Sequence, residues 1–360
     1  MAGRLMPKIL FLTLHRKDRS PGQRFRHEQY LDYLERNGVE ITYSPMLDAR
    51  QDKIFYGSGN TSGKIGVGIS AMLKRVKDVF RSNRYDYIFI YRDAFFFGTF
   101  FEWLFKKSKA KLIFDFDDSI WLQDENPNQS FFQKLKNPAK TGKIISYCDL
   151  TIAGNEYLAS YARKHTDSVT IIPTTIDMAD YVRVHVSKQQ PGICIGWSGS
   201  FSTIKHFESA LEPLKKIKEK YGDQVYFKVI GDGSYKNEDL GIRGLAWKSE
   251  TEVSDLCEID IGIMPLPDDD WSKGKCGLKG LQYMALEIPT IMSPVGVNSD
   301  IIQDGENGFL ASTTEEWVEK LSLLIENIDL RKRVGKVGRK TVERDFSVEA
   351  NKEKWLDVFR

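Results

Sequence analysis

Residues 271–310 read WSKGKCGLKGLQYMALEIPTIMSPVGVNSDIIQDGENGFL. The apolar spacing after the glycines predicts a helix over about 277–287, and the run TIMSPV (290–295) predicts a buried strand directly after it. The run GFLAS (308–312) repeats the strand pattern. Helices that alternate with short apolar strands are typical of parallel α/β sheets.

The same alternation extends over the whole chain. Further strands are expected at 8–14, 39–44, 87–91, 111–116, 149–153, 168–172, 192–197, 225–231 and 259–264. Further helices are expected at 23–37, 64–83, 97–107, 130–147, 156–165, 204–220, 250–257, 314–327 and 329–343.

The polar stretch VRVHVSKQQPG (182–192) interrupts this pattern and is interpreted as a linker. The sequence therefore predicts two doubly wound, Rossmann-like parallel-sheet domains, over 1–180 and 190–345. Residues 346–360 are expected to form a terminal amphipathic helix with Trp355, Val358 and Phe359 on one side.

Composition narrows the class of protein. The 360 residues are 41% hydrophobic and 28% charged, which is typical of a soluble globular protein of two domains. A net charge of +2 gives no support for nucleic-acid binding. The four cysteines form no C-x-x-C pair, so we expect reduced thiols and a cytoplasmic protein. The five histidines lack zinc-ligand spacing.

Three strand-to-helix turns carry glycine and basic residues. In SPGQRFR, Pro21 and Gly22 precede Arg24 and Arg26 at a helix start, which suits an anion, although a solvated basic loop explains the same residues equally well. In WSGSFSTIKHF, Gly199 and Ser200 are followed by Lys205, and small residues let backbone approach a phosphate.

The third turn lies in 271–310 and is the most specific. Lysines alternate with glycines there at a helix start, and backbone amides with ammonium groups form a cradle for a diphosphate. The residues concerned are Lys273, Gly274, Lys275, Gly277, Lys279 and Gly280. The order of a Walker loop is absent.

This segment resembles the donor-binding signature of the family-4, or group 1, retaining glycosyltransferases. LQYMA, EIP, SPVGVNSD and DGENGFL occupy the places of family motifs in the same order. IPTTID (172–177), VIGDG (229–233) and GNEYLASYA (154–162) also resemble family segments, so the similarity covers most of the chain. The resemblance implies a GT-B fold, with the two domains facing each other across a cleft and the final helix returning to the first domain.

Four positions depart from the family pattern. Gln282 stands where the family has the glutamate that holds the ribose, and Gly274 stands for the glutamate at the donor sugar. Lys205 is present without its partner arginine, which is replaced by Ser200. Asp117 and Asp118 replace a histidine–aspartate pair. We interpret the set as a subgroup with a lysine-rich donor loop.

The resemblance implies a metal-independent transfer of a sugar from a nucleotide diphosphate to a glycan or lipid-linked acceptor, in bacterial surface polysaccharide or glycoconjugate synthesis. It needs no cofactor beyond the donor substrate. Asp118, Lys205 and Lys279 are the expected catalytic residues. Donor binding is assigned to Gly22, Arg24, Gly199, Ser200, Gly231, Trp247, Lys275, Cys276, Gly277, Leu278 and Gln282, and the acceptor side to Arg92, Asp93 and Asp117.

Alternatives remain open at two levels. The chain as a whole could be a GT-B-shaped isomerase or phosphorylase, or a nucleotide-sugar-binding protein without activity. The motif Asp115-x-Asp117 could hold a metal ion. The aromatic run at 95–105, followed by four lysines up to Lys111, is either core or a peripheral contact with the anionic inner face of a membrane.

Overall fold

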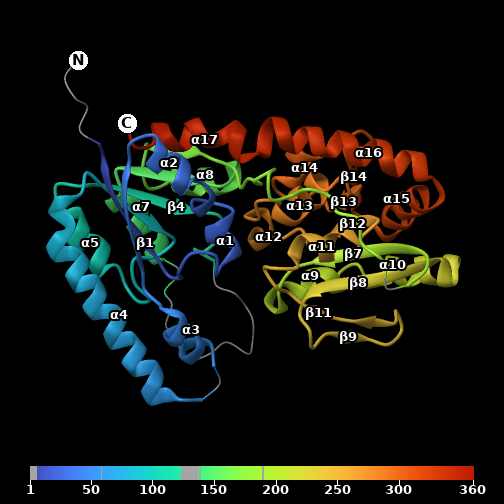
Figure 1. Cartoon of the computed structure of the whole chain (residues 1–360), viewed down its shortest axis with the longest axis horizontal. Helices are drawn as coiled ribbons and strands as arrows, with labels where there is room; N and C mark the ends of the chain where they lie inside the picture. Colours follow the sequence, from blue (N-terminus) through green and yellow to red (C-terminus); the bar gives the residue numbers. More distant parts are fainter. Residues whose placement is uncertain (1–5, 58, 123–136, 138, 189) are drawn as a thin grey trace. The chain divides into compact units, whose positions relative to one another are not determined.

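The computed structural model describes residues 6–57, 59–122, 137, 139–188 and 190–360 (Figure 1). The chain divides into two compact units. Unit 1 comprises Met1–Pro173 and Lys352–Arg360, and unit 2 comprises Thr174–Asn351.

Among the described residues, unit 1 contains one parallel six-stranded sheet in the order β2-β1-β3-β4-β5-β6. The order reverses between β1 and β3, as in doubly wound folds. The strands are β1 (Lys8–Thr13), β2 (Glu40–Pro45), β3 (Tyr87–Tyr91), β4 (Lys111–Phe116), β5 (Leu150–Ala153) and β6 (Val169–Ile171). The helices are α1 (Pro21–Arg24), α2 (Leu31–Arg36), α3 (Ala49–Tyr56), α4 (Thr61–Arg81), α5 (Phe100–Lys106), α7 (Lys140–Tyr147) and α8 (Glu156–Ala162).

The chain's last helix, α17 (Val348–Asp357), ends in unit 1. Trp355 is fully buried and stacks on Tyr30 with ring centroids 5.2 Å apart. Phe359 is also buried and lies against Phe11 of β1 and Phe89 of β3. These rings cover the centre of the sheet, so the carboxyl-terminal residues complete the core of unit 1.

Unit 2 repeats the architecture with the order β11-β8-β7-β12-β13-β14, parallel throughout its described strands. The strands are β7 (Ile193–Ser198), β8 (Val225–Gly231), β11 (Leu245–Ala246), β12 (Ile261–Met264), β13 (Thr290–Met292) and β14 (Phe309–Leu310), beside the antiparallel pair β9 (Lys236–Asn237) and β10 (Ile242–Arg243). The helices are α9 (Ile204–Glu208), α10 (Leu211–Tyr221), α11 (Glu252–Cys257), α12 (Asp270–Lys273), α13 (Leu278–Ala285), α14 (Asn298–Ile301), α15 (Thr314–Glu326) and α16 (Ile328–Thr341).

Several elements differ from the sequence expectations. Helix α3 was not expected, and the helix expected at 204–220 is divided into α9 and α10. The helix expected over 23–37 is broken into α1, a 3-10 turn and α2. The stretch 182–192, interpreted as a linker, belongs to unit 2, where Arg183 donates to the carbonyl of Glu287 at 3.2 Å and Val184 N–H contacts the Cys257 sulfur at 3.4 Å. Much of the helix expected at 130–147 lies outside the described residues, and its described part is α7.

Candidate functional site

The carboxyl ends of β7 and β12 mark the switch point of the unit 2 sheet. β7 pairs with β8 on one side and with β12 on the other, so the chain leaves these two central strands in opposite directions. Ligands of doubly wound sheets bind beyond this point. The turn after β7 carries Gly199 and Ser200, and the loop after β12 leads to Lys275 and the start of α13. Two of the predicted phosphate turns therefore meet at one edge of the sheet.

Glycine is required where these turns approach each other. Gly231 at the end of β8 has φ 133°, and a Cβ there would overlap the carbonyl oxygen of Gly199. Gly199 donates its N–H to Ile230 O at 2.8 Å, and a Cβ on Gly199 would overlap the indole of Trp197. A side chain at Gly231 would force the two turns apart, and a side chain at Gly199 would displace the Trp197 indole.

Three lysines act electrostatically on the side chain of His206 in α9. His206 is 2% exposed, and neither ring nitrogen has a hydrogen-bond partner among the described residues. Burial, followed by the charges of Lys279, Lys275 and Lys205, lowers the pKa of His206 to about 4. Asp269 acts in the opposite direction but less strongly, so the net field at His206 is positive, and the neutral imidazole adds no charge to it.

The loop before α13 positions two of these lysines. Gly277 caps α13 in the left-handed region, with φ 71°, and Leu278 begins the helix. Lys275 lies over the ring of Trp271 at 5.3 Å, and Lys279 lies over the ring of Trp197 at 5.6 Å. Both contacts hold an ammonium group over an aromatic face.

Lys273 and Cys276, on either side of Lys275 in the sequence, make contacts of different kinds. Lys273, which the sequence also placed in the cradle, pairs with Asp268 at 3.5 Å and Asp270 at 3.3 Å. Cys276 is half-buried, and its sulfur lies 3.8 Å from Gly274 O. The charge of Lys273 is therefore already partly neutralised, in contrast to the basic surroundings of His206.

Gln282 and Trp247 belong to a separate buried network. The Gln282 amide donates to Tyr181 Oη at 2.5 Å and to Glu252 Oε1 at 3.1 Å, and the Trp247 indole donates to the same oxygen at 2.9 Å. Tyr181 donates to Glu252 Oε2 at 3.1 Å. An amide at position 282 can donate to Glu252, whereas the family's glutamate would bring two carboxylates together. Glutamine in place of glutamate at position 282 therefore suits the neighbouring Glu252.

In unit 1, Gly22, Arg92 and Asp117 meet at the carboxyl edge of the sheet. Arg92 donates to Asp117 Oδ1 from Nε at 2.9 Å and from Nη2 at 2.6 Å, and Tyr91 Oη donates at 2.8 Å. Burial opposes ionisation of Asp117, but these partners outweigh it and lower the pKa of the carboxyl group. A Cβ on Gly22 would overlap Tyr91 Oη, so glycine lets the SPG turn lie against this group.

The same edge holds Asp118 and a strained arginine. Arg92 Nη2 lies 3.8 Å from Asp118 Oδ2, and the backbone of Arg92 has φ 63°. A non-glycine residue in the left-handed region costs about 1–3 kcal/mol and is concentrated at functional sites. The side chain of Asp93, assigned to the acceptor side, instead pairs with Lys140 at 2.7 Å.

The expected anion site at the start of α1 needs one correction. Arg26 is fully buried and forms an ion pair with Asp115, with a second bond from Nε to Oδ2 at 3.3 Å. It also donates to Ile172 O. Arg26 thus holds the sheet together rather than facing a ligand, while Arg24 closes α1 with its guanidinium 5.1 Å from the Phe25 ring.

The alternative of a metal at Asp115 and Asp117 finds no support in their contacts. Both carboxylates already accept from guanidinium groups, Asp115 from Arg26 and Asp117 from Arg92. Within the described ranges, the acidic, histidine and cysteine side chains form no cluster suited to a metal ion.

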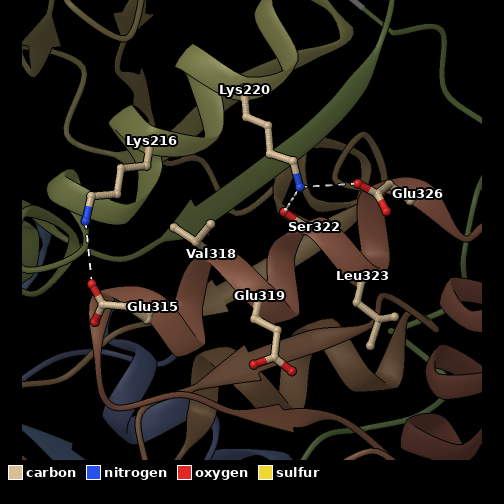
Figure 2. A pocket seen from close by; sticks show the side chains of 8 residues that line it. All are labelled: Lys216, Lys220, Glu315, Val318, Glu319, Ser322, Leu323 and Glu326. Carbon is tan, nitrogen blue, oxygen red and sulfur yellow. Dashed lines mark hydrogen bonds and ion pairs between the residues drawn. The ribbon is translucent and has the colours of Figure 1, made fainter.

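A groove lies on the surface between α10 and α15 of unit 2 (Figure 2). Its lysines face acids: Lys216 lies 3.6 Å from Glu315, and Lys220 lies 3.4 Å from Glu326 and donates to Ser322 at 3.0 Å. The groove shares no residue with the predicted donor site. Because both of its lysines pair with glutamates, their charge is partly neutralised.

Residues 192–327 match the family model described as glycosyl transferases group 1. This part of the chain is therefore similar to group 1 glycosyltransferases. Among curated relatives, the chain resembles poly(ribitol-phosphate) alpha-N-acetylglucosaminyltransferase of Staphylococcus aureus, at 23% identity over 194 residues, 51% of this chain and 38% of the relative. The chain spans less than half the length of the curated relatives it matches.

Two solved structures are similar to this chain over nearly its full length. Sucrose-phosphate synthase from Thermosynechococcus elongatus superposes with a TM-score of 0.70 at 13% identity, covering 98% of both chains. HepE from Anabaena, solved with UDP and glucose, gives 0.65 at 12% identity and covers 98% of this chain and 99% of that one. These likenesses establish the fold as GT-B-like, with two parallel six-stranded sheets among the described residues.

The helices of the described segments include none that is both long and apolar enough to cross a membrane. The four cysteines are free thiols, three of them buried.

The sequence reasoning overlooked several residues of the unit 2 site. His206 stood directly after Lys205 in the quoted turn, but histidines were considered only as zinc ligands. Tyr181 fell in the supposed end of the first domain, and Glu252 in an ordinary helix. Their roles depend on contacts between segments 70 to 100 residues apart, such as Tyr181 with Glu252 and Gln282, which periodicity does not reveal.

Proposed function

We propose that the chain is a glycosyltransferase that moves a sugar from a UDP-sugar to a glycan or lipid-linked acceptor, with retention of configuration and without a metal ion. The observation that carries the proposal is the basic cluster of Lys205, Lys275 and Lys279 around the buried His206, beside the close-packed turns of Gly199 and Gly231. It lies in the domain that matches the family model.

The relatives support the choice of donor. HepE was solved with UDP and glucose, and the Staphylococcus aureus relative is named for transfer of N-acetylglucosamine to poly(ribitol phosphate). Three ammonium groups can neutralise a diphosphate without a divalent cation, which supports metal independence. The acceptor class is proposed from the relative's name alone and from the resemblance of the motifs.

In the proposed reaction, the bond between the sugar C1 and the β-phosphate oxygen breaks and a bond between C1 and an acceptor hydroxyl oxygen forms. The nucleotide diphosphate leaves with the negative charge that develops on its β-phosphate, and the hydroxyl proton passes to the departing phosphate. Lys205, Lys275 and Lys279 would stabilise this charge, together with backbone amides near Gly277. Removing one such donor typically lowers turnover by about 10²–10³-fold. On the acceptor side, Asp118 would hold the acceptor or the sugar, and Arg92 and Asp117 would orient it.

A thermal-shift screen against UDP-, GDP- and dTDP-sugars in the presence of EDTA tests the donor. Ligand at about 100 times its Kd stabilises a protein by about 2.7 kcal/mol, so a binding nucleotide raises Tm measurably. UDP release that requires an added acceptor supports glycosyl transfer. Conversion of the nucleotide sugar without acceptor would indicate an isomerase or phosphorylase, and binding without turnover would indicate a binding protein.

A further inference from the structure

The buried face of helix α4 in unit 1 carries charged side chains. Its buried positions are Val67, Ala71, Arg75 and Asp78. Arg75 Nη1 donates to Asp78 Oδ2 at 2.8 Å, and Arg75 also donates to Ala94 O at 2.6 Å and Thr13 O at 3.0 Å. The inner face is thus held by two small apolar side chains and a hydrogen-bonded ion pair, which is the opposite of an ordinary surface helix.

The outer face of α4 is apolar. Six large hydrophobic side chains are exposed at spacings of one to four residues: Ile65 55%, Ile69 52%, Met72 44%, Leu73 61%, Val76 37% and Phe80 85%. At 100° per residue these positions fall on one arc of the helix, away from the buried arc. Single exposed apolar residues need no explanation, but a contiguous stripe marks an interaction surface. Figure 1 shows α4 at the outside of unit 1, beside α5.

The charges around this stripe are basic. The one acid in the sequence of α4 is Asp78, which is buried and paired with Arg75 and Arg81. Lys77 is exposed beside the stripe, and Arg84 follows the helix. Basic residues that flank a strongly apolar face are characteristic of helices that lie in the interface of an anionic membrane.

The neighbouring helix α5 adds to this surface. In the aromatic run 95–105, Phe101 and Phe105 are buried, but Phe100 is 61% and Trp103 is 40% exposed, and their rings stack at 6.0 Å. Lys107 lies 3.5 Å from the Trp103 ring centroid. Aromatic rings beside lysines suit the level of lipid headgroups. The run is therefore partly core and partly surface, and its apolar exposure is smaller than that of α4.

We propose that the outer face of α4 is a membrane-docking surface that inserts its apolar stripe into an anionic lipid bilayer. A second copy of the chain fits less well, because a symmetric contact between two such stripes would bring their basic flanks together without acids. The surface lies in unit 1, apart from the lysine cluster of unit 2, so it does not depend on the proposed transfer reaction.

Vesicle sedimentation at low salt tests this inference. We expect the full chain to bind vesicles of phosphatidylglycerol and phosphatidylcholine and to bind phosphatidylcholine alone weakly. The triple variant Ile69→Ser, Leu73→Ser, Phe80→Ser should lose binding by on the order of tenfold or more, because burial of apolar area drives the insertion. A matched triple in unit 2 at the exposed Leu323, Ile328 and Val337, also to serine, should bind as the unaltered chain does.

Two further measurements show whether the variants remain folded and whether position 80 itself contacts lipid. All six substituted side chains are exposed, so Tm and UDP binding of both triples should match the unaltered chain. A Phe80→Trp variant should show more fluorescence quenching by brominated lipids than the unaltered chain, which already has seven tryptophans.

Three results would overturn the inference. The first is no sedimentation of the unaltered chain at low salt. The second is equal loss in the unit 2 triple. The third is a dimer in analytical ultracentrifugation that the α4 triple abolishes, which would make the stripe a subunit interface. Loss of UDP binding would bear on the proposed function alone.

Discussion

Replacing Lys279 by alanine should lower turnover sharply while leaving the fold intact. The Lys279 ammonium group lies over the Trp197 ring and, with Lys205 and Lys275, lowers the pKa of His206. Two unit charges 4 Å apart interact by about 4 kcal/mol at an effective dielectric of 20. The two remaining lysines and water compensate in part, so we expect a loss of about 2.7–4 kcal/mol, or about 10²–10³-fold in kcat.

The assay is the initial rate of UDP release at saturating donor, with Lys205→Ala measured in parallel. Lys216→Ala is the matched control, because its ammonium group pairs with Glu212 and Glu315 outside the cluster. A second readout does not depend on activity: removing the positive charge of Lys279 should raise the pKa of His206 from about 4, as followed by NMR of the imidazole. Turnover within a few-fold of the unaltered enzyme for both cluster variants, or an unchanged His206 pKa, would refute the reasoning.

Three other predictions concern the buried polar groups. Gln282→Glu should lower stability by about 1–3 kcal/mol, because it turns a donor to Glu252 into a second carboxylate; the loss should be larger at pH 8 than at pH 5, and equal urea midpoints would argue against the network. Arg26→Met should cost about 3–5 kcal/mol by leaving Asp115 buried without its partner, and a loss below 1 kcal/mol in urea unfolding would contradict that role. Burial and three lysines lower the His206 pKa from 6.5 to about 4, so the unfolded state binds the proton first and stability falls as pH drops from about 6.5 to 4; His206→Leu should flatten that slope, and an unchanged slope would contradict it.

The sequence was sufficient for the alternating elements but not for every helix. The central strands are short runs of mostly apolar residues, and such runs predict strands that are buried on both faces of a sheet. Helix α3 was missed because it has only 8 residues and half of them are polar. The sequence nevertheless contains a capping box at the start of this helix. The Asp48 side chain accepts from Gln51 N, and the Gln51 side chain accepts from Asp48 N.

The candidate site was predictable only in part. Lys205, Lys275 and Lys279 were found because glycine-rich turns after strands are local features. Arg26 was placed at an anion site because its true partner, Asp115, lies 89 residues away. The apolar stripe of α4 escaped notice for a related reason: the sequence shows a periodic apolar pattern, but only the burial of Arg75 and Asp78 reveals that the pattern faces outward.

The central claim is that the lysine cluster of unit 2 binds the diphosphate of a UDP-sugar without a metal ion. Calorimetric titration of UDP into the full chain in EDTA tests it most directly, with the variants Lys205→Ala/Lys279→Ala and Lys216→Ala beside it. The account predicts binding to the unaltered chain and to Lys216→Ala, and a loss of affinity of on the order of 100-fold or more in the double variant. Equal affinity in all three proteins, or binding that appears only when Mg²⁺ or Mn²⁺ is added, would contradict it.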